Sequence, residues 1–262
     1  MIAQRPVQFT GQAFLLSNSR GGGMCQGLRR NYRAGIAILV YLLLSVVPLW
    51  AQHDQHGSAG SGAGWDGSIA GIAYSEFNHH LTGMLVVIIG LSELRHALAT
   101  RFWAWTRFLL PGALFATGTF LLVWSDHNAW PIGPLSFMQT FFGSDQEIFQ
   151  HKSYGLLSLM VGAIELLRRF GQIRHAAWVA PLPLFAIIGG LMLFGHSHGD
   201  HPSAHQIARD HAIMGSMAVT AGSSKLLADW FRSPSNTESS KWELPWACLI
   251  LLIGIQLLMY SE

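Results

Sequence analysis

Charged residues are scarce in this sequence. Asp, Glu, Lys and Arg make up only 11% of its 262 residues, whereas 50% of the residues are hydrophobic. A soluble domain carries roughly 25% charged residues, so the composition argues against a soluble protein. Several apolar runs approach the ~20 residues that an α-helix needs to cross a membrane. None of them alternates with the period of two of a membrane β-barrel, so we expect an all-α bundle of transmembrane helices.

Cysteine is also scarce, and several common catalytic motifs are missing. The two cysteines, Cys25 and Cys248, lie before the first apolar run and inside the last one, which argues against a disulfide framework. The sequence has no glycine-rich nucleotide loop, nucleophile elbow or paired-cysteine metal motif. The net charge is only +2 and the arginines fall in short connections between apolar runs. We therefore expect no nucleic acid among its partners.

The N-terminal part has the pattern of a secretory signal. Residues 34–49 are apolar, follow a cluster of arginines and run into Trp50 and Ala51. This order of basic, apolar and small residues is typical of a signal peptide, with an uncleaved membrane helix as the alternative. We expect residues 1–51 to be a signal peptide with an extended basic region. Residues 52–75 are rich in Gly and Ser and are predicted to form a flexible segment.

Six apolar segments are predicted to cross the membrane in the remaining domain, residues 76–262. They cover residues 80–99, 107–125, 152–169, 177–195, 212–229 and 245–260. Lys and Arg concentrate in the first, third and fifth connections between these segments, and the positive-inside rule places such connections in the cytoplasm. We therefore expect a multi-pass protein of the bacterial inner membrane, surrounded by lipid, with both mature termini on the periplasmic side.

One pattern, H-x3-G-x6-G-x2-[E/K], occurs three times, starting at His79, His151 and His211. Its glycines are Gly83, Gly155 and Gly215 at the first position and Gly90, Gly162 and Gly222 at the second; Glu93, Glu165 and Lys225 end it. The surrounding units, about 76–127, 148–199 and 208–262, are predicted to be three tandem helical hairpins around a pseudo-threefold axis.

The spacing of this pattern places its histidine and both glycines on one helix face. Glycines on such a face let membrane helices approach closely. We therefore expect the three glycine faces to point towards the axis, so that the histidines meet at its periplasmic mouth. The acidic and basic residues that end the pattern are then predicted to form an ion-pair cluster or, alternatively, part of an ion or proton path.

Histidine is the abundant chemistry-bearing residue, with 13 copies, and all but His96 and His175 fall on the predicted periplasmic side. Imidazole binds Zn, Cu, Fe and Ni. His79, His151 and His211 are therefore the predicted core ligands of a metal site, with helix capping as the alternative role. The predicted auxiliary ligands lie at the ends of the partner helices and are Asp126, His127, His196 and His198.

Copper is the metal that the surrounding residues favour, with zinc as the alternative. Met84, Met214 and Met217 lie within about two helical turns of the histidine level. Thioether sulfur is a soft ligand that selects copper, and a periplasmic location suits copper handling. The sequence assigns no catalytic residue.

The membrane region resembles the His-rich inner-membrane proteins of bacterial copper-resistance systems, the copper-resistance D type. The likeness lies in histidines at the outer ends of several helices, in the segments FNHHLTG, FQHKSYG and HSHGDH. It implies a role in copper handling, resistance or delivery, with other metal-handling proteins as partners.

Two other functions are compatible with the sequence. One is a membrane-embedded metalloenzyme, an oxidase or hydrolase, that uses a three-histidine metal with an open coordination position. The other is a structural or assembly subunit without metal, in which the histidines cap helices and the glycines only pack them.

Overall fold

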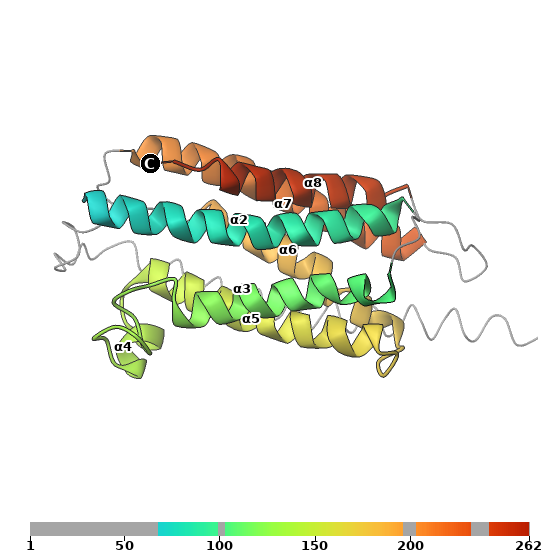
Figure 1. Ribbon diagram of the computed structural model, residues 1–262, viewed down its shortest axis with the longest axis horizontal. Helices are drawn as coiled ribbons and strands as arrows, with labels where there is room; N and C mark the ends of the chain where they lie inside the picture. The colour runs from blue at the N-terminus through green and yellow to red at the C-terminus, as the bar shows by residue number, and fades with distance from the viewer. Residues whose placement is uncertain (1–67, 99–102, 196–202, 232–240, 262) are drawn as a thin grey trace, which may run out of the picture. The chain divides into compact units, whose positions relative to one another are not determined.

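The computed structural model describes residues 68–98, 103–195, 203–231 and 241–261 (Figure 1). All of them belong to one compact unit, residues 51–262, of the two into which the chain divides. This part of the chain is helical and contains no β-strand, which confirms the predicted all-α class. The predicted signal peptide and most of the predicted flexible segment lie outside the described residues.

The helices coincide with the six predicted apolar segments, with one short addition. In chain order they are α2 (Ile69–Ala97), α3 (Leu109–Val123), α4 (Phe137–Phe142), α5 (Gln146–Arg169), α6 (Pro181–Leu193), α7 (Ala204–Phe231) and α8 (Glu243–Leu258), with 3₁₀ turns η1 (Ala104–Phe108) and η2 (Ala176–Val179) before α3 and α6. Three of these stretches, α2, η1 with α3, and η2 with α6, are long and apolar enough to cross a membrane, while α8 is apolar but shorter. The chain is therefore a helical membrane protein.

The first helix of each predicted hairpin begins earlier than the apolar run that predicted it. The Ser68 side chain accepts a hydrogen bond from the Gly71 backbone N–H at the start of α2, and Asp145 caps α5 in the same way through Ile148. Residues 69–75, which we expected to be flexible, are consequently helical. The expectation was wrong because a cap of this kind, rather than hydropathy, determines where the helix starts.

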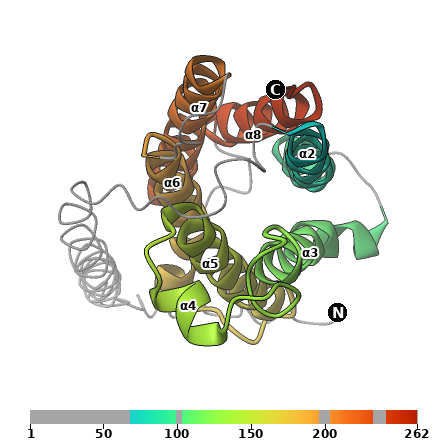
Figure 2. The ribbon, with the colours of Figure 1, turned by 90° about the vertical axis from the view of Figure 1, so that its left-hand side faces the viewer.

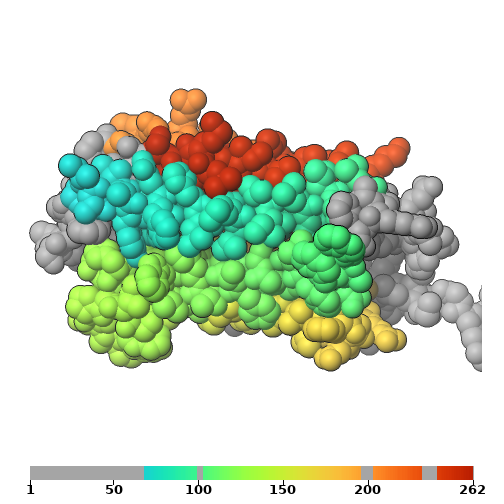
Figure 3. Space-filling view, in the orientation of Figure 1, coloured from blue at the N-terminus to red at the C-terminus, as the bar shows by residue number. Residues whose placement is uncertain are grey.

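Seen end-on, α2, α8, α7, α6, α5 and α3 follow one another around a ring (Figure 2). The most extensive contacts join α2 with α8, α3 with α5, and α6 with α7. Each tight pair therefore combines helices from two different predicted hairpins. In the space-filling view α2 lies between α8 and α3 on one side of this ring (Figure 3).

Glycines from the repeated pattern lie inside these three tight pairs. Gly83 faces Gly254 between α2 and α8, Gly155 faces Gly118 between α5 and α3, and Gly215 faces Gly190 between α7 and α6. A methyl group added to Gly215 would lie only 2.7 Å from the backbone oxygen of Gly190. The expectation that the glycine faces meet at a central axis was wrong, because backbone contact this close requires one directly apposed helix.

The outward surface of the ring is apolar along the middle of its helices. Large exposed apolar side chains there are Ile88 and Leu91 on α2, Leu156 and Met160 on α5, and Leu252 and Ile255 on α8. A soluble protein rarely carries so much contiguous apolar surface, whereas lipid requires it.

Candidate functional site

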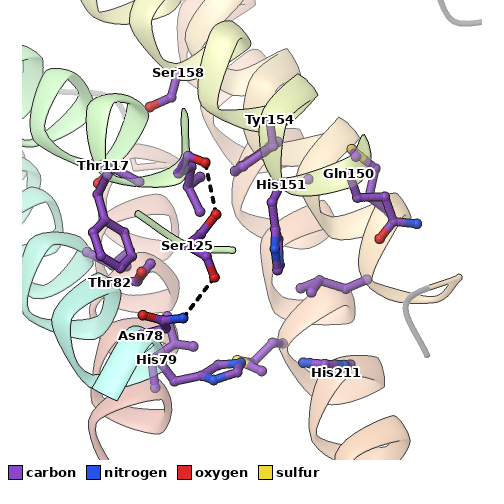
Figure 4. A pocket seen from close by; sticks show the side chains of 18 of the residues that line it. Asn78, His79, Thr82, Thr117, Ser125, Gln150, His151, Tyr154, Ser158 and His211 are labelled. Carbon is purple, nitrogen blue, oxygen red and sulfur yellow. Dashed lines mark hydrogen bonds between the residues drawn. The ribbon is translucent and has the colours of Figure 1, made fainter. Parts of the chain in front are cut away.

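A cavity of about 400 Å³ lies on the inside of the ring and receives side chains from all six long helices. We call the end of the bundle where α2, α5 and α7 begin the histidine end. His79, His151 and His211 line the cavity there from α2, α5 and α7 respectively (Figure 4). The structure therefore brings the three predicted core ligands to one cavity, even though the glycines beside them pack elsewhere.

His151 contacts a buried ion pair, Asp126 and Lys152, at the histidine end. Its Nδ1 lies 2.8 Å from Asp126 Oδ1, and Lys152 Nζ lies 3.0 Å from Asp126 Oδ2. The Lys152 side chain is fully buried and also donates to the Leu121 carbonyl oxygen at 3.1 Å. Ser125 donates its hydroxyl to the same Asp126 carboxylate. Both carboxylate oxygens are thus occupied by side chains of the protein.

Electrostatics explains why Asp126 stays ionised although it is buried. Burial by itself raises the pKa of Asp126, but the charge and hydrogen bond of His151, together with Lys152 and Ser125, outweigh it. The pKa of this carboxyl consequently lies below its ordinary value of 3.8. Asp126 was predicted as an auxiliary metal ligand; in the structure its Oδ1 lies 2.8 Å from His151 Nδ1.

Replacing Asp126 with Asn is expected to lower the free energy of unfolding by about 3 kcal/mol, because it leaves the buried Lys152 ammonium without its counter-ion. Adding Lys152→Met should restore at least half of that loss, since the uncompensated charge is then removed. The measurement is SDS-induced unfolding of the protein in detergent micelles, followed by circular dichroism. If the double variant lost as much free energy of unfolding as the two single variants together, the two charges would not stabilise each other.

His79 and His211 lie side by side at the histidine end of the cavity. Their ring centroids are 6.1 Å apart and their planes are inclined by 27°. His79 Nδ1 lies 2.8 Å from the Ser75 carbonyl oxygen, one turn earlier in α2, and the Tyr260 ring stacks on His79 at 3.8 Å. His211 is almost completely buried, with 2% of its surface exposed. The C-terminal end of α8 therefore supports the same two histidines that face the cavity.

The remaining predicted ligands differ in their placement. The His127 ring packs edge-on against Tyr74, with centroids 5.7 Å apart, and also lines the cavity. His196 and His198 lie outside the described residues. Among residues 68–98, 103–195, 203–231 and 241–261, no three His, Cys, Asp or Glu side chains are grouped closely enough to hold a metal ion.

The three methionines that favoured copper in the sequence analysis lie in different surroundings. Met214 is buried and lines the cavity one turn along α7 from His211. Met84 is 51% exposed on the outside of α2, and Met217 packs against the hydrophobic core. Only Met214 of the three therefore lines the cavity at which the histidines meet.

An ion-pair network lies at the opposite end of the bundle. Arg169 contacts both Glu93, at 3.2 Å, and Glu165, at 3.6 Å, while Lys225 pairs with Glu243 at 2.7 Å. The three acids are almost fully buried. The predicted cluster of Glu93, Glu165 and Lys225 thus forms, but through Arg169 and Glu243 rather than through direct contact between its members.

Trp246 connects this network to the cavity. Its indole N–H donates to Glu93 Oε2 at 3.0 Å, and its ring lines the cavity from α8. The sequence pattern did not identify Trp246 as an inner wall of the cavity. Its exposed fraction is only 2%.

Sequence reasoning also missed several other polar residues that line the cavity. Thr117 on α3 and Ser158 on α5 are buried in the middle of apolar runs, and Asn78 and Tyr74, at the histidine end, precede the first predicted segment. The signal that could have identified Thr117 and Ser158 was their position at the centre of an apolar helix, because a hydroxyl group buried there needs a polar partner.

No protein-family model, curated protein or solved structure matches this chain.

Proposed function

We propose that this chain is a membrane protein that binds a transition-metal ion, with copper favoured over zinc, through His79, His151 and His211 at the histidine end of its cavity. The observation that carries the proposal is that these three imidazoles, from three different helices, line one cavity. The role that follows is copper handling, by resistance or by delivery to other metal-handling proteins.

The hydrogen bonds of two of these histidines support ligation. Metal-binding histidines usually donate one ring N–H to a carboxylate or a backbone carbonyl, which orients the ring and directs the lone pair of the other nitrogen at the metal. His151 has Asp126 in that place and His79 has the Ser75 carbonyl oxygen. In both residues Nδ1 makes this bond, so Nε2 is the ligand nitrogen.

The separation of His79 and His211 also suits one shared ion. A metal–nitrogen bond to imidazole is about 2.0–2.1 Å long and the ring centre lies about 1.1 Å behind the nitrogen, so two opposed imidazoles on one ion have centroids about 6 Å apart. The centroids of His79 and His211 are 6.1 Å apart. Soft sulfur from the neighbouring Met214 favours copper at such a pair. His151 is the third proposed ligand, and His127 and the segment 196–198 are the proposed sources of further ligands.

The site belongs to a proposed bacterial inner-membrane protein with six spans and a periplasmic histidine end. α5 and α7 carry more polar residues than the other spans, and several of their polar side chains are accommodated inside the bundle: His151, Ser158 and His211 line the cavity, while Glu165 and Lys225 belong to the ion-pair network. Residues 1–51 are proposed to be the signal peptide of this protein. The equivalent glycine contacts in the three tight pairs support descent from three tandem hairpins.

A membrane-impermeant thiol reagent tests this topology in a background with Cys25→Ser and Cys248→Ala. A cysteine replacing the exposed Met138 is expected to react in intact cells, whereas one replacing the exposed Gln172 should react only after permeabilisation. The opposite pattern would place the histidines in the cytoplasm, and equal labelling at both positions would contradict six spans.

Elemental analysis of protein purified without a histidine tag tests metal binding itself. We expect about one copper ion per chain after gel filtration in detergent. Protein that retains no copper or zinc after incubation with either ion would favour the structural-subunit alternative.

A further inference from the structure

Below the histidines, the cavity continues towards Trp246 between apolar walls. Val86, Ile89, Leu114, Ile250 and Ile253 form much of this inner part. The total volume of about 400 Å³ falls in the range of roughly 300–1,000 Å³ that is typical of sites for small organic molecules. A metal ion at the mouth would occupy only a small part of this space.

The inner part of the cavity is unsuited to an ionic ligand. The charged side chains that line the cavity lie at the histidine end: Asp126 follows α3, and Asp145 and Glu147 lie at the start of α5. Glu93 is separated from the cavity by Trp246, which it holds by a hydrogen bond. An occupant of the inner part must therefore be uncharged, because no counter-ion is available at that depth.

One polar group of the inner part is without a partner. Thr117 Oγ1 is buried and makes no hydrogen bond within the part of the chain that the structure describes, although Thr117 is only 6% exposed. A buried hydroxyl without a partner costs about 1–3 kcal/mol. Thr117 lines the cavity from the middle of α3, so an occupant with an oxygen atom at this level would remove that cost.

Aromatic side chains define the shape of the same region. Phe185 and Tyr154 stack with centroids 4.3 Å apart, and both line the cavity together with Phe120 and Trp246. Flat aromatic faces favour a planar ring, which they contact by offset or edge-to-face packing.

We propose that the inner cavity binds an uncharged, flat, lipid-soluble ring that carries carbonyl or hydroxyl oxygens, the chemistry of quinones and phenols. Its oxygen takes the hydrogen bond of Thr117, its ring lies among the aromatic side chains, and its apolar substituent contacts the aliphatic wall. Binding of this ligand requires no metal ion at the mouth of the cavity. It assigns binding only and involves no reaction.

The test uses the full chain in lipid nanodiscs after treatment with a metal chelator, with a decyl-substituted ubiquinone analogue as the probe. Binding to the cavity is expected to quench tryptophan fluorescence with saturation near one quinone per chain. Quinone that merely dissolves in the lipid gives quenching that rises without saturation. Purely linear quenching of the wild type would overturn the proposal.

Two matched substitutions on α3 test the position of the ligand. Thr117→Val keeps the shape of the side chain but removes its hydroxyl, and loss of one hydrogen bond should weaken binding about 5–10-fold. Thr119→Val makes the same change on the exposed side of the helix and should leave affinity unchanged. Equal affinities of both variants would overturn the role of Thr117.

Filling the cavity provides an independent check. Ala186 lines it from α6, and Ala186→Phe is expected to abolish saturable quenching in protein that still elutes as a folded monodisperse species. Dodecane and laurate serve as competitors that lack the oxygen-bearing ring or carry a charge. Displacement of the quinone by either of them at equal concentration would overturn the proposed ligand class.

Discussion

Replacing His79 and His211 together with alanine is expected to reduce the copper retained by the purified protein at least tenfold. The two rings lie 6.1 Å apart and line the same cavity, so the double variant removes both proposed ligands from one side of the ion. Loss of a hydrogen-bonding partner behind a ligand already costs 10–100-fold in metal affinity, and loss of the ligands themselves costs more. The measurement is copper per chain after gel filtration.

A neighbouring histidine provides the matched control for this experiment. His80 follows His79 directly but bonds the Tyr260 carbonyl oxygen through Nε2 at 2.9 Å. His80→Gln preserves a donor for that carbonyl and should retain copper as the wild type does. His151→Ala is expected to give an intermediate loss. Full copper retention in the His79 and His211 double variant would refute the assigned site.

The second large effect concerns the glycines of the tight helix pairs. Gly215→Ala is expected to lower the free energy of unfolding by about 2–3 kcal/mol, because overpacking a close interface typically costs 1–3 kcal/mol. The added methyl group would lie 2.7 Å from the Gly190 backbone oxygen and 3.2 Å from a Phe194 ring carbon. A backbone oxygen cannot move aside without separating α6 from α7.

Gly112 allows the same substitution without the clash. It lies inside α3, and a methyl group added there meets no other atom within 4 Å. Gly112→Ala should therefore leave stability unchanged or raise it by up to about 1 kcal/mol, which is the helix-propensity gain. SDS unfolding of both variants in the same detergent gives the comparison. Equal effects at Gly112 and Gly215 would contradict the packing described here.

The sequence predicted the helices well because hydropathy reports directly on burial in lipid. All six predicted apolar segments are helical. It failed at the starts of α2 and α5, where Ser68 and Asp145 cap the helices and extend them through polar residues. Hydropathy does not detect such caps, because a cap is a hydrogen bond between a polar side chain and the backbone and buries no apolar surface.

The candidate site could be predicted only in part. The repeat spacing identified His79, His151 and His211, and the structure brings all three to one cavity. The spacing could not show that the glycines beside them face a single neighbouring helix, because periodicity identifies a face but not its partner. Nor could it show that Lys152 forms an ion pair with Asp126, since the contact depends on how α5 packs against the end of α3.

The ion-pair network illustrates the same limit. The repeat placed Glu93, Glu165 and Lys225 at one level, and the structure surrounds them with opposite charges. Arg169 and Glu243 lie at the ends of α5 and α8, outside the repeated pattern. Which of several nearby charges becomes the partner is decided by helix packing and length.

The most extensive contact of the ring joins its first and last helices, α2 and α8. The ribosome delivers α2 to the membrane well before α8, since the chain is made from its N-terminus. During that interval Gly83 and Gly90 have not yet met the backbone of α8 that they later contact, and Trp246 and Tyr260 are still to be synthesised. The cavity and both of its ends therefore come into existence only when the final helix inserts, which makes ring closure the last step in assembling a binding-competent protein.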